Sequence, residues 1–357
     1  MTDDASTATD RRSVLRAGLA ASAVLAAPAG LLAASPAAAG PSATARRGDP
    51  FTLGVASGEP SPEGFVLWTR LAPDPLAEDG LGGMGERRTD VEWELAADER
   101  FRRIVRRGVG TTGPELGHSV HVEAAGLAPG REYFYRFRAE GSISPTGRTR
   151  TAPAAASMVP LTMCFTSCSQ YEHGFFTAYA RLAQDEPDLV LHLGDYLYEY
   201  AAGEYVAPQG NVRDHLGPET STLAGYRQRH AQYRTDADLQ AAHAVAPWLV
   251  VFDDHEVENN WADDARELPE DPPGPFAPRR AAALRAYWEN MPLRAAQRPS
   301  GADMRLYRSV GWGATAAFHM LDTRQYRTDQ PCEDTFPADC DARTDPAASL
   351  PGSEQER

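Results

Sequence analysis

The chain has 357 residues, of which 42% are hydrophobic and 9% aromatic, so it is long enough for two globular domains with a sizeable core. Its formal net charge is −15, with 35 Lys and Arg against 50 Asp and Glu. This balance argues against general nucleic-acid binding, which needs a basic surface. It is compatible with the binding of hard cations, although most of these carboxylates are expected to lie on a solvated surface.

Residues 1–39 have the organisation of a signal peptide. Arg11 and Arg12 are followed by the Ala/Leu/Val-rich run Ala17–Ala27, and Ala37–Ala39 supplies a small-residue cleavage site. The run is too short and too rich in alanine for a stable membrane span. The paired arginines resemble a twin-arginine signal, with an ordinary secretory signal as the alternative. We therefore expect recognition by the twin-arginine export machinery and a secreted protein that is extracellular or associated with the cell wall.

The four cysteines fall into two kinds. Cys332 and Cys340 lie close together in an Asp/Pro-rich segment, and an oxidising compartment would allow them to form a disulfide. Cys164 lies inside an apolar segment and is expected to be a small core residue. Cys168 follows the same segment and is a candidate metal ligand.

Residues 50–152 show short apolar segments separated by turn signals, the pattern of an all-β domain. The expected strands are Phe51–Ala56, Phe65–Leu71, Val91–Leu95, Ser119–Glu123 and Tyr133–Phe137. Leu127, a Pro-Gly turn and the Tyr-rich last strand resemble the tyrosine corner of a fibronectin-III-like β-sandwich. We predict such a sandwich over residues 50–152, without a catalytic constellation. His118 and His121 face opposite sides of their strand and are expected at the surface.

From about residue 160, three apolar strands are each followed by side chains that can bind metal. Leu161–Phe165 precedes Cys168, Leu189–Leu193 precedes Asp195, and Trp248–Phe252 precedes the run Asp253–Glu256. A helix expected over 175–184 separates the first two strands, so they form a βαβ unit with parallel pairing. Parallel strands present their C-terminal ends at one edge of the sheet, where α/β proteins collect ligands. One such coincidence could arise by chance, but three in register indicate a metal site.

The remaining elements are further helices and one late strand. Helices are expected at Leu223–Arg234, Asp238–Ala246 and about Pro278–Met291. The strand Thr315–Leu321 ends in Asp322-Thr323-Arg324, which would either position a phosphate or form a structural ion pair. A capping box at Ser353–Glu356 opens a helix with one residue left, so we expect a fragment with weak metal binding and little activity. Full turnover by the purified chain would refute this expectation.

The motifs of this second unit resemble those of a known family. Gly194-Asp195 with Tyr198, and the later Asp-His-Glu run that ends at Glu256, resemble the calcineurin-like metallophosphoesterase pattern in its purple-acid-phosphatase variant. Cys168 and Asp253-Asp254 depart from that pattern. Together with LDTRQYR at 321–327 and a preceding sandwich, these departures resemble the alkaline phosphatase D family, whose relatives include a calcium-dependent phospholipase D of actinomycetes. The resemblance implies a β-sandwich followed by an α/β metallophosphoesterase sandwich domain over 160–357, here incomplete.

The resemblance also implies two metal ions, Fe(3+) and Ca(2+). Cys168, Asp195 and Tyr198 would hold the ferric ion, and Asp195 would bridge it to calcium. Anionic thiolate, phenolate and carboxylate ligands stabilise a trivalent iron, whereas carboxylate and amide oxygens suit calcium. Asp254 would bind calcium, with help from Asn259 or its neighbour Asn260.

The implied activity is that of a secreted phosphoric ester hydrolase that uses a metal-activated hydroxide. His255 would hydrogen-bond the phosphate and, with Asp195, would be catalytic. The substrates would be phosphate esters. A phospholipase D-type diesterase is the first alternative, and a non-catalytic secreted binding protein with a structural metal is the second. The family's late Gly-Asp-x-His motif is absent from this sequence, where only His319 follows His255. The remaining metal ligands are therefore expected outside it.

Overall fold

The computed structural model describes residues 48–267, 275–334 and 339–356. The predicted signal peptide, residues 1–39, lies outside these ranges. The strands are β1 Val55–Ser61, β2 Gly64–Arg70, β3 Thr89–Ala96, β4 Ile104–Thr112, β5 Ser119–Ala124, β6 Glu132–Ala139, β7 Ser142–Ile143, β8 Gly147–Arg150, β9 Met163–Thr166, β10 Leu189–His192, β11 Pro247–Val250, β12 Arg308–Trp312 and β13 Ala316–Met320. The α-helices are α1 Thr177–Asp185, α2 Leu223–Arg234, α3 Ala237–Val245, α4 Phe276–Asn290 and α5 Gly352–Gln355. In this described part, no helix is both long and apolar enough to cross a membrane.

A six-stranded sheet in the order β5-β2-β1-β11-β10-β9 organises the chain. Its strands β9, β10 and β11 are parallel neighbours, which confirms the predicted βαβ arrangement. Every residue of β10 and β11 is buried, because helices and loops cover both faces of these central strands. The carboxyl ends of the three strands therefore lie side by side at one edge of the sheet.

Strand β1 joins the two sequence regions into this one sheet. It pairs in parallel with β11, and Gly58 of β1 lies opposite Trp248 of β11. The absence of a side chain at Gly58 allows the two strands to come close enough to pair. A Cβ added at Gly58 would lie 2.7 Å from the Trp248 carbonyl oxygen and 2.6 Å from that of Pro292. The sequence did not reveal this pairing, because β1 reads as part of a separate N-terminal unit.

The N-terminal strands form a second sheet as well. It has the order β4-β3-β6-β7, with β8 also paired to β6. One buried apolar cluster contains residues of both sheets, including Val55, Leu67, Leu95 and Phe137. The Tyr133 hydroxyl accepts a hydrogen bond from the Ala128 amide at 3.1 Å, as expected for a tyrosine corner.

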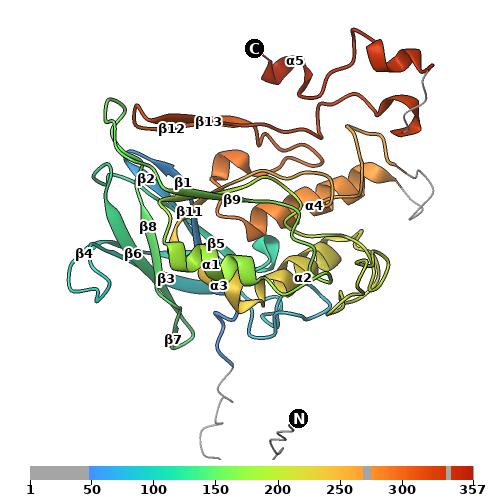
Figure 1. Cartoon of the computed structure of the whole chain (residues 1–357). Helices are drawn as coiled ribbons and strands as arrows, with labels where there is room; N and C mark the ends of the chain where they lie inside the picture. The colour runs from blue at the N-terminus through green and yellow to red at the C-terminus, as the bar shows by residue number, and fades with distance from the viewer. Residues whose placement is uncertain (1–47, 268–274, 335–338, 357) are drawn as a thin grey trace, which may run out of the picture. The chain divides into compact units, whose positions relative to one another are not determined.

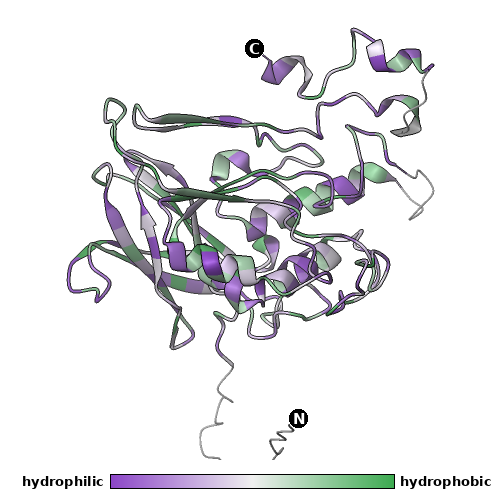
Figure 2. Ribbon diagram, viewed as in Figure 1, coloured by the Kyte–Doolittle hydropathy of each residue, from purple (hydrophilic) through white to green (hydrophobic). Residues whose placement is uncertain are grey.

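Helices and a hairpin cover the six-stranded sheet. In Figure 1, α1 and α3 lie below its central strands and the β12–β13 hairpin lies above them. Figure 2 shows these central strands mainly in the hydrophobic colour, whereas α1 carries both colours, as an amphipathic helix should. The buried cluster that contains Leu191, Trp248 and Leu249 also contains Trp312 and Met320 of the hairpin.

Several expectations need correction. His118 is buried and His121 is half-buried, so neither is exposed as expected: the His118 ring bonds the Gly85 carbonyl, and the His121 ring stacks on Trp288 at 4.2 Å. The late strand exists as β13 but pairs with β12 in a separate two-stranded sheet. Strand β4 went unpredicted because its sequence, IVRRGVGTT, is polar and rich in glycine. The predicted disulfide between Cys332 and Cys340 is present.

Candidate metal centre

The loop after β10 depends on backbone conformations that few residues adopt. Gly194 has φ +109°, and a Cβ there would lie 2.5 Å from the Cβ of Asp253, so only glycine fits. Asp195 and Cys168 both lie in the left-handed region, at φ 54° and 55°. Such conformations cost about 1 kcal/mol or more for non-glycine residues and concentrate at functional sites.

Backbone hydrogen bonds also join the loop after β9 to the loop after β10, beyond the ends of the two paired strands. The Cys168 amide donates to the Gly194 carbonyl at 3.2 Å, and the Ser169 amide donates to the Asp195 carbonyl at 3.0 Å. The loop after β9 is thereby held against the loop after β10. This contact places Cys168 beside Asp195, whose charge adds to the effect of burial in raising the pKa of the Cys168 thiol.

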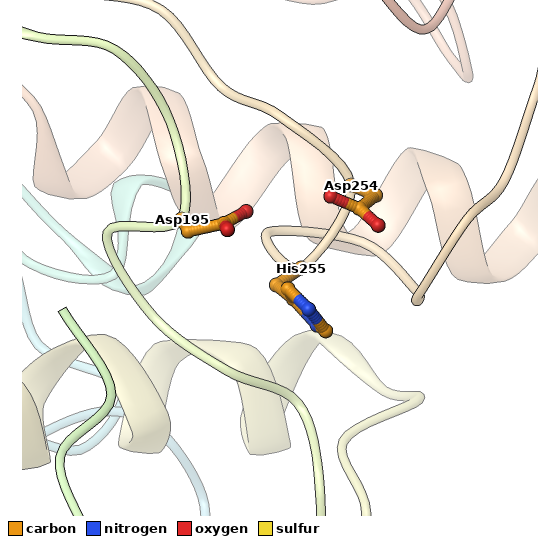
Figure 3. Close-up of side chains that lie close together, drawn as sticks. All are labelled: Asp195, Asp254 and His255. Atoms are coloured by element: carbon orange, nitrogen blue, oxygen red, sulfur yellow. The ribbon is translucent and has the colours of Figure 1, made fainter. Parts of the chain in front are cut away.

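Three of the predicted site residues form one buried cluster. Asp195, Asp254 and His255 each offer a ligand atom, and these atoms lie within 4.8 Å of one another. Figure 3 shows the three side chains converging from the loop after β10 and the loop after β11. The Tyr198 hydroxyl donates to Asp195 Oδ2 at 3.3 Å, and the Tyr198 ring stacks on His255 with centroids 4.1 Å apart.

The two asparagines after β11, Asn259 and Asn260, were predicted to help bind calcium, but both side-chain amides bond Glu267. The Asn259 amide group donates to Glu267 Oε2 at 2.5 Å, so its side chain turns away from the cluster. Asn260 contacts Asp254 through its backbone amide, which donates to Asp254 Oδ2 at 2.7 Å, while its own side-chain amide donates to Glu267.

Sequence reasoning missed the role of Glu256, a fully buried carboxylate behind the cluster. It accepts the backbone amides of Asp195 at 3.1 Å, Tyr196 at 2.6 Å and Asp253 at 2.9 Å. The Glu256 side chain therefore binds backbone amides of both the loop after β10 and the loop after β11. Its place in the Asp-His-Glu motif was visible, but its contacts depend on the fold.

Arg324, for which the sequence left phosphate positioning and a structural ion pair open, forms ion pairs in the structure. Its Nε donates to Asp253 Oδ1 at 2.6 Å, and its guanidinium lies 3.3 Å from Asp254. Asp322 instead accepts the backbone amides of Arg324 and Gln325 and so shapes the turn that presents the guanidinium. Arg324 thus forms ion pairs with the carboxylates of the β11 loop, not with Asp322.

Burial and neighbouring charges disfavour the ionised form of Asp195. Burial, together with the charges of Asp254 and Asp253, raises the pKa of Asp195 from 3.8 to about 6 despite the nearby His255. Because this pKa rises on folding, the metal-free fold loses stability as pH increases from about 4 through about 6. Asp195 Oδ1 is buried without a hydrogen-bond partner. A cation at this oxygen would satisfy it and remove the repulsion, so the residues fit a metal ion.

His255 is held among carboxylates. Burial favours its neutral ring, but the hydrogen bond to Glu199 and the charges of Glu199, Asp254 and Asp195 outweigh burial and raise its pKa to about 9. Burial and the nearby Asp195 charge raise the pKa of the Tyr198 hydroxyl, and burial also raises that of the Cys168 thiol. Without a metal, both groups therefore keep their protons at neutral pH.

Comparison with known proteins identifies the family. The family model for PhoD-like phosphatases matches residues 163–357, and the model for their N-terminal domain matches residues 35–153. Alkaline phosphatase D of Bacillus subtilis (strain 168) is 53% identical over 309 residues, which are 86% of this chain. A solved structure of PhoD matches 87% of the chain with a TM-score of 0.82 and 52% identity. The chain therefore belongs to the PhoD-like phosphatase family.

The matches cover only part of these relatives. The chain spans 52% of the length of the B. subtilis protein and 59% of the solved PhoD chain. A purple acid phosphatase from yellow lupin matches 73% of this chain and 42% of its own, at 13% identity and a TM-score of 0.43, too distant to support an argument.

Replacing Glu256 with Gln should destabilise the metal-free fold by about 1–3 kcal/mol. Gln keeps one acceptor oxygen, so at least one of the three buried backbone amides loses its partner. Urea unfolding followed by circular dichroism measures the difference. The same substitution at the exposed Glu99 is the control and should change stability by less than about 0.5 kcal/mol. Equal effects at the two positions would contradict the proposed role of Glu256.

Proposed function

We propose that this protein is a metal-dependent hydrolase of phosphoric esters. The observation that carries the proposal is the buried convergence of Asp195, Asp254 and His255 at the carboxyl ends of β10 and β11. Membership of the PhoD-like phosphatase family supports it, as does the name of the B. subtilis relative, an alkaline phosphatase. Buried acidic clusters beside a histidine suit metal-assisted hydrolysis, in which the cations clamp phosphate oxygens and activate water.

We propose further that the metals are Fe(3+) and Ca(2+). Tyr198 hydrogen-bonds Asp195, and the loop that carries Cys168 is hydrogen-bonded to the backbone at Gly194 and Asp195. A thiol, a phenol and a carboxylate thus come from adjoining segments, and together they would form an anionic ligand set for a trivalent ion. Asp195 and Asp254 supply carboxylate oxygens of the kind that calcium prefers. Asn259 could join them only if its amide left Glu267.

The chain's own residues would prepare the site for a phosphate ester. Arg324 neutralises Asp253 and Asp254. His255, with its raised pKa, can donate a hydrogen bond to a phosphate oxygen. The burial of the cluster limits competition from bulk water for these interactions.

Asp195→Asn should lower hydrolysis at least about 100-fold, because an amide cannot supply the charge that a bridging ligand needs. The full-length protein would be assayed with p-nitrophenyl phosphate and bis(p-nitrophenyl) phosphate, and its metal content determined. Asp185→Asn, an exposed carboxylate paired with Arg181, is the matched control. Unchanged activity in Asp195→Asn would refute the assignment. A strong preference for the diester would favour the phospholipase D-type alternative.

The iron assignment predicts colour. A phenolate or thiolate bound to Fe(3+) gives a visible charge-transfer band, and Tyr198→Phe should remove or shift it. Tyr200→Phe is the control, because Tyr200 meets His255 through its ring, which the variant keeps. A colourless protein that contains only calcium and lacks phosphatase activity would favour the non-catalytic binding protein instead.

We propose that residues 50–152 form a fibronectin-III-like sandwich. Support comes from the shared core of the two N-terminal sheets and from the bond between the Ala128 amide and the Tyr133 hydroxyl. An experimental structure in which β8 pairs with β1 instead of β6 would contradict this topology.

We also propose that the protein is exported by the twin-arginine pathway. The Arg11-Arg12 pair supports this, and the disulfide between Cys332 and Cys340 fits an oxidising compartment. Changing both arginines to Lys should leave the precursor in the cytoplasm, as measured by cell fractionation and immunoblotting. Arg16→Lys is the control. Undiminished export of the double variant would favour an ordinary secretory signal.

A further inference from the structure

Glu199 is a buried carboxylate beside the cluster for which the sequence suggested no role. It follows Asp195 by four residues in the loop after β10, and only 1% of it is exposed. Its Oε2 lies 2.8 Å from His255 Nδ1, and its Oε1 accepts the backbone amide of Asn259 at 2.7 Å. Both partners belong to the loop after β11. Glu199 therefore mirrors Glu256, which reaches from the β11 loop to the backbone of the β10 loop.

We propose that Glu199 is a positioning residue that holds the His255 ring with a proton on Nδ1 and leaves Nε2 for the site. Only the expected effect of Glu199 on hydrolysis rests on the proposed function; its effect on the His255 ring does not. A carboxylate accepts hydrogen bonds but does not donate them, so the ring nitrogen that faces it must carry the proton. The bond thus selects the neutral tautomer with the proton on Nδ1. The charged ring, which carries a proton on both nitrogens, can make the same bond.

Two tyrosines limit the ring to this orientation. Tyr198 stacks on His255 with centroids 4.1 Å apart and planes at 29°, and Tyr200 meets the ring edge-on at 5.4 Å. The stacked face of Tyr198 restricts the tilt of the imidazole. Stacking alone would still allow a 180° flip of the ring about its Cβ–Cγ bond, which exchanges Nδ1 with Cδ2. The bond from Nδ1 to Glu199 selects one of these two orientations. Carboxylates orient functional histidines in this way at many metal sites.

The substitution Glu199→Gln tests the assignment because Gln has only one acceptor oxygen. The Asn259 amide is a backbone donor, fixed in place, and should retain that oxygen. The amino group of Gln would then face His255 Nδ1, which must become an acceptor, and the proton moves to Nε2. The structure therefore predicts a change of tautomer with little change of fold.

Long-range ¹H–¹⁵N correlation spectra of the metal-free full-length protein report the tautomer directly, at a pH high enough for the ring to be neutral. His255→Gln identifies the signals. Wild type should show a protonated Nδ1 and Glu199→Gln a protonated Nε2. Glu204→Gln is the matched control, since Glu204 lies exposed in the same loop and also accepts a backbone amide. It should leave the tautomer unchanged.

In the metal-loaded protein, Glu199→Gln should lower kcat about 10–100-fold with little change in KM, whereas Glu204→Gln should match wild type. A wild-type ring with a bare Nδ1, or a protonated Nδ1 in Glu199→Gln, would overturn the proposal. If Glu199→Gln fails to fold, the wild-type spectrum alone decides. A tautomer switch in a protein that hydrolyses neither ester would support the positioning role and overturn the proposed function.

Discussion

The parallel pairing of β10 with β11 is the constraint on which the site depends. Both strands are fully buried, so packing on both faces of the sheet fixes their register. The positions at which the two following loops begin are therefore fixed as well. Gly194 then lets the two loops approach until a side chain at that position would collide with Asp253. No other residue permits this contact, and without it Asp195 and Asp254 would not share one cluster.

Two glutamates stabilise this approach. Glu256 accepts backbone amides of the β10 loop, and Glu199 accepts an amide and an imidazole of the β11 loop. Both are almost completely buried, where an unpaired carboxylate would cost several kcal/mol. Their hydrogen bonds offset that cost only while the two loops stay together. The supporting residues and the candidate metal ligands therefore form one cooperative unit.

The N-terminal region contributes to the rigidity of the same sheet. Strand β1 continues the sheet beside β11, and Glu59 at its end pairs with Arg308 of β12. On the other side, His121 of β5 bonds two carbonyls near the end of α4 and stacks on Trp288. These contacts explain why His121, which resembles a surface residue in the sequence, is half-buried: its ring packs between β5 and the end of α4.

The sequence by itself determined the order of the elements, the three strand tips and most of the candidate ligands. These features follow from local patterns, because an apolar run, a glycine and the residues that follow them lie close together in the sequence. The tertiary structure decided the rest: the β1–β11 pairing, the burial of His118, the partners of Arg324 and the contacts of Glu199 and Glu256. Each of these features depends on contacts between segments that are far apart in the sequence. The sequence also cannot distinguish a glutamate that accepts a buried backbone amide from one that lies in water. The sequence already marked Asp195 in the stretch from Leu189 to Tyr200 as a candidate metal ligand. Only the fold shows that Glu199 of the same stretch bonds His255, which lies in the same cluster as Asp195.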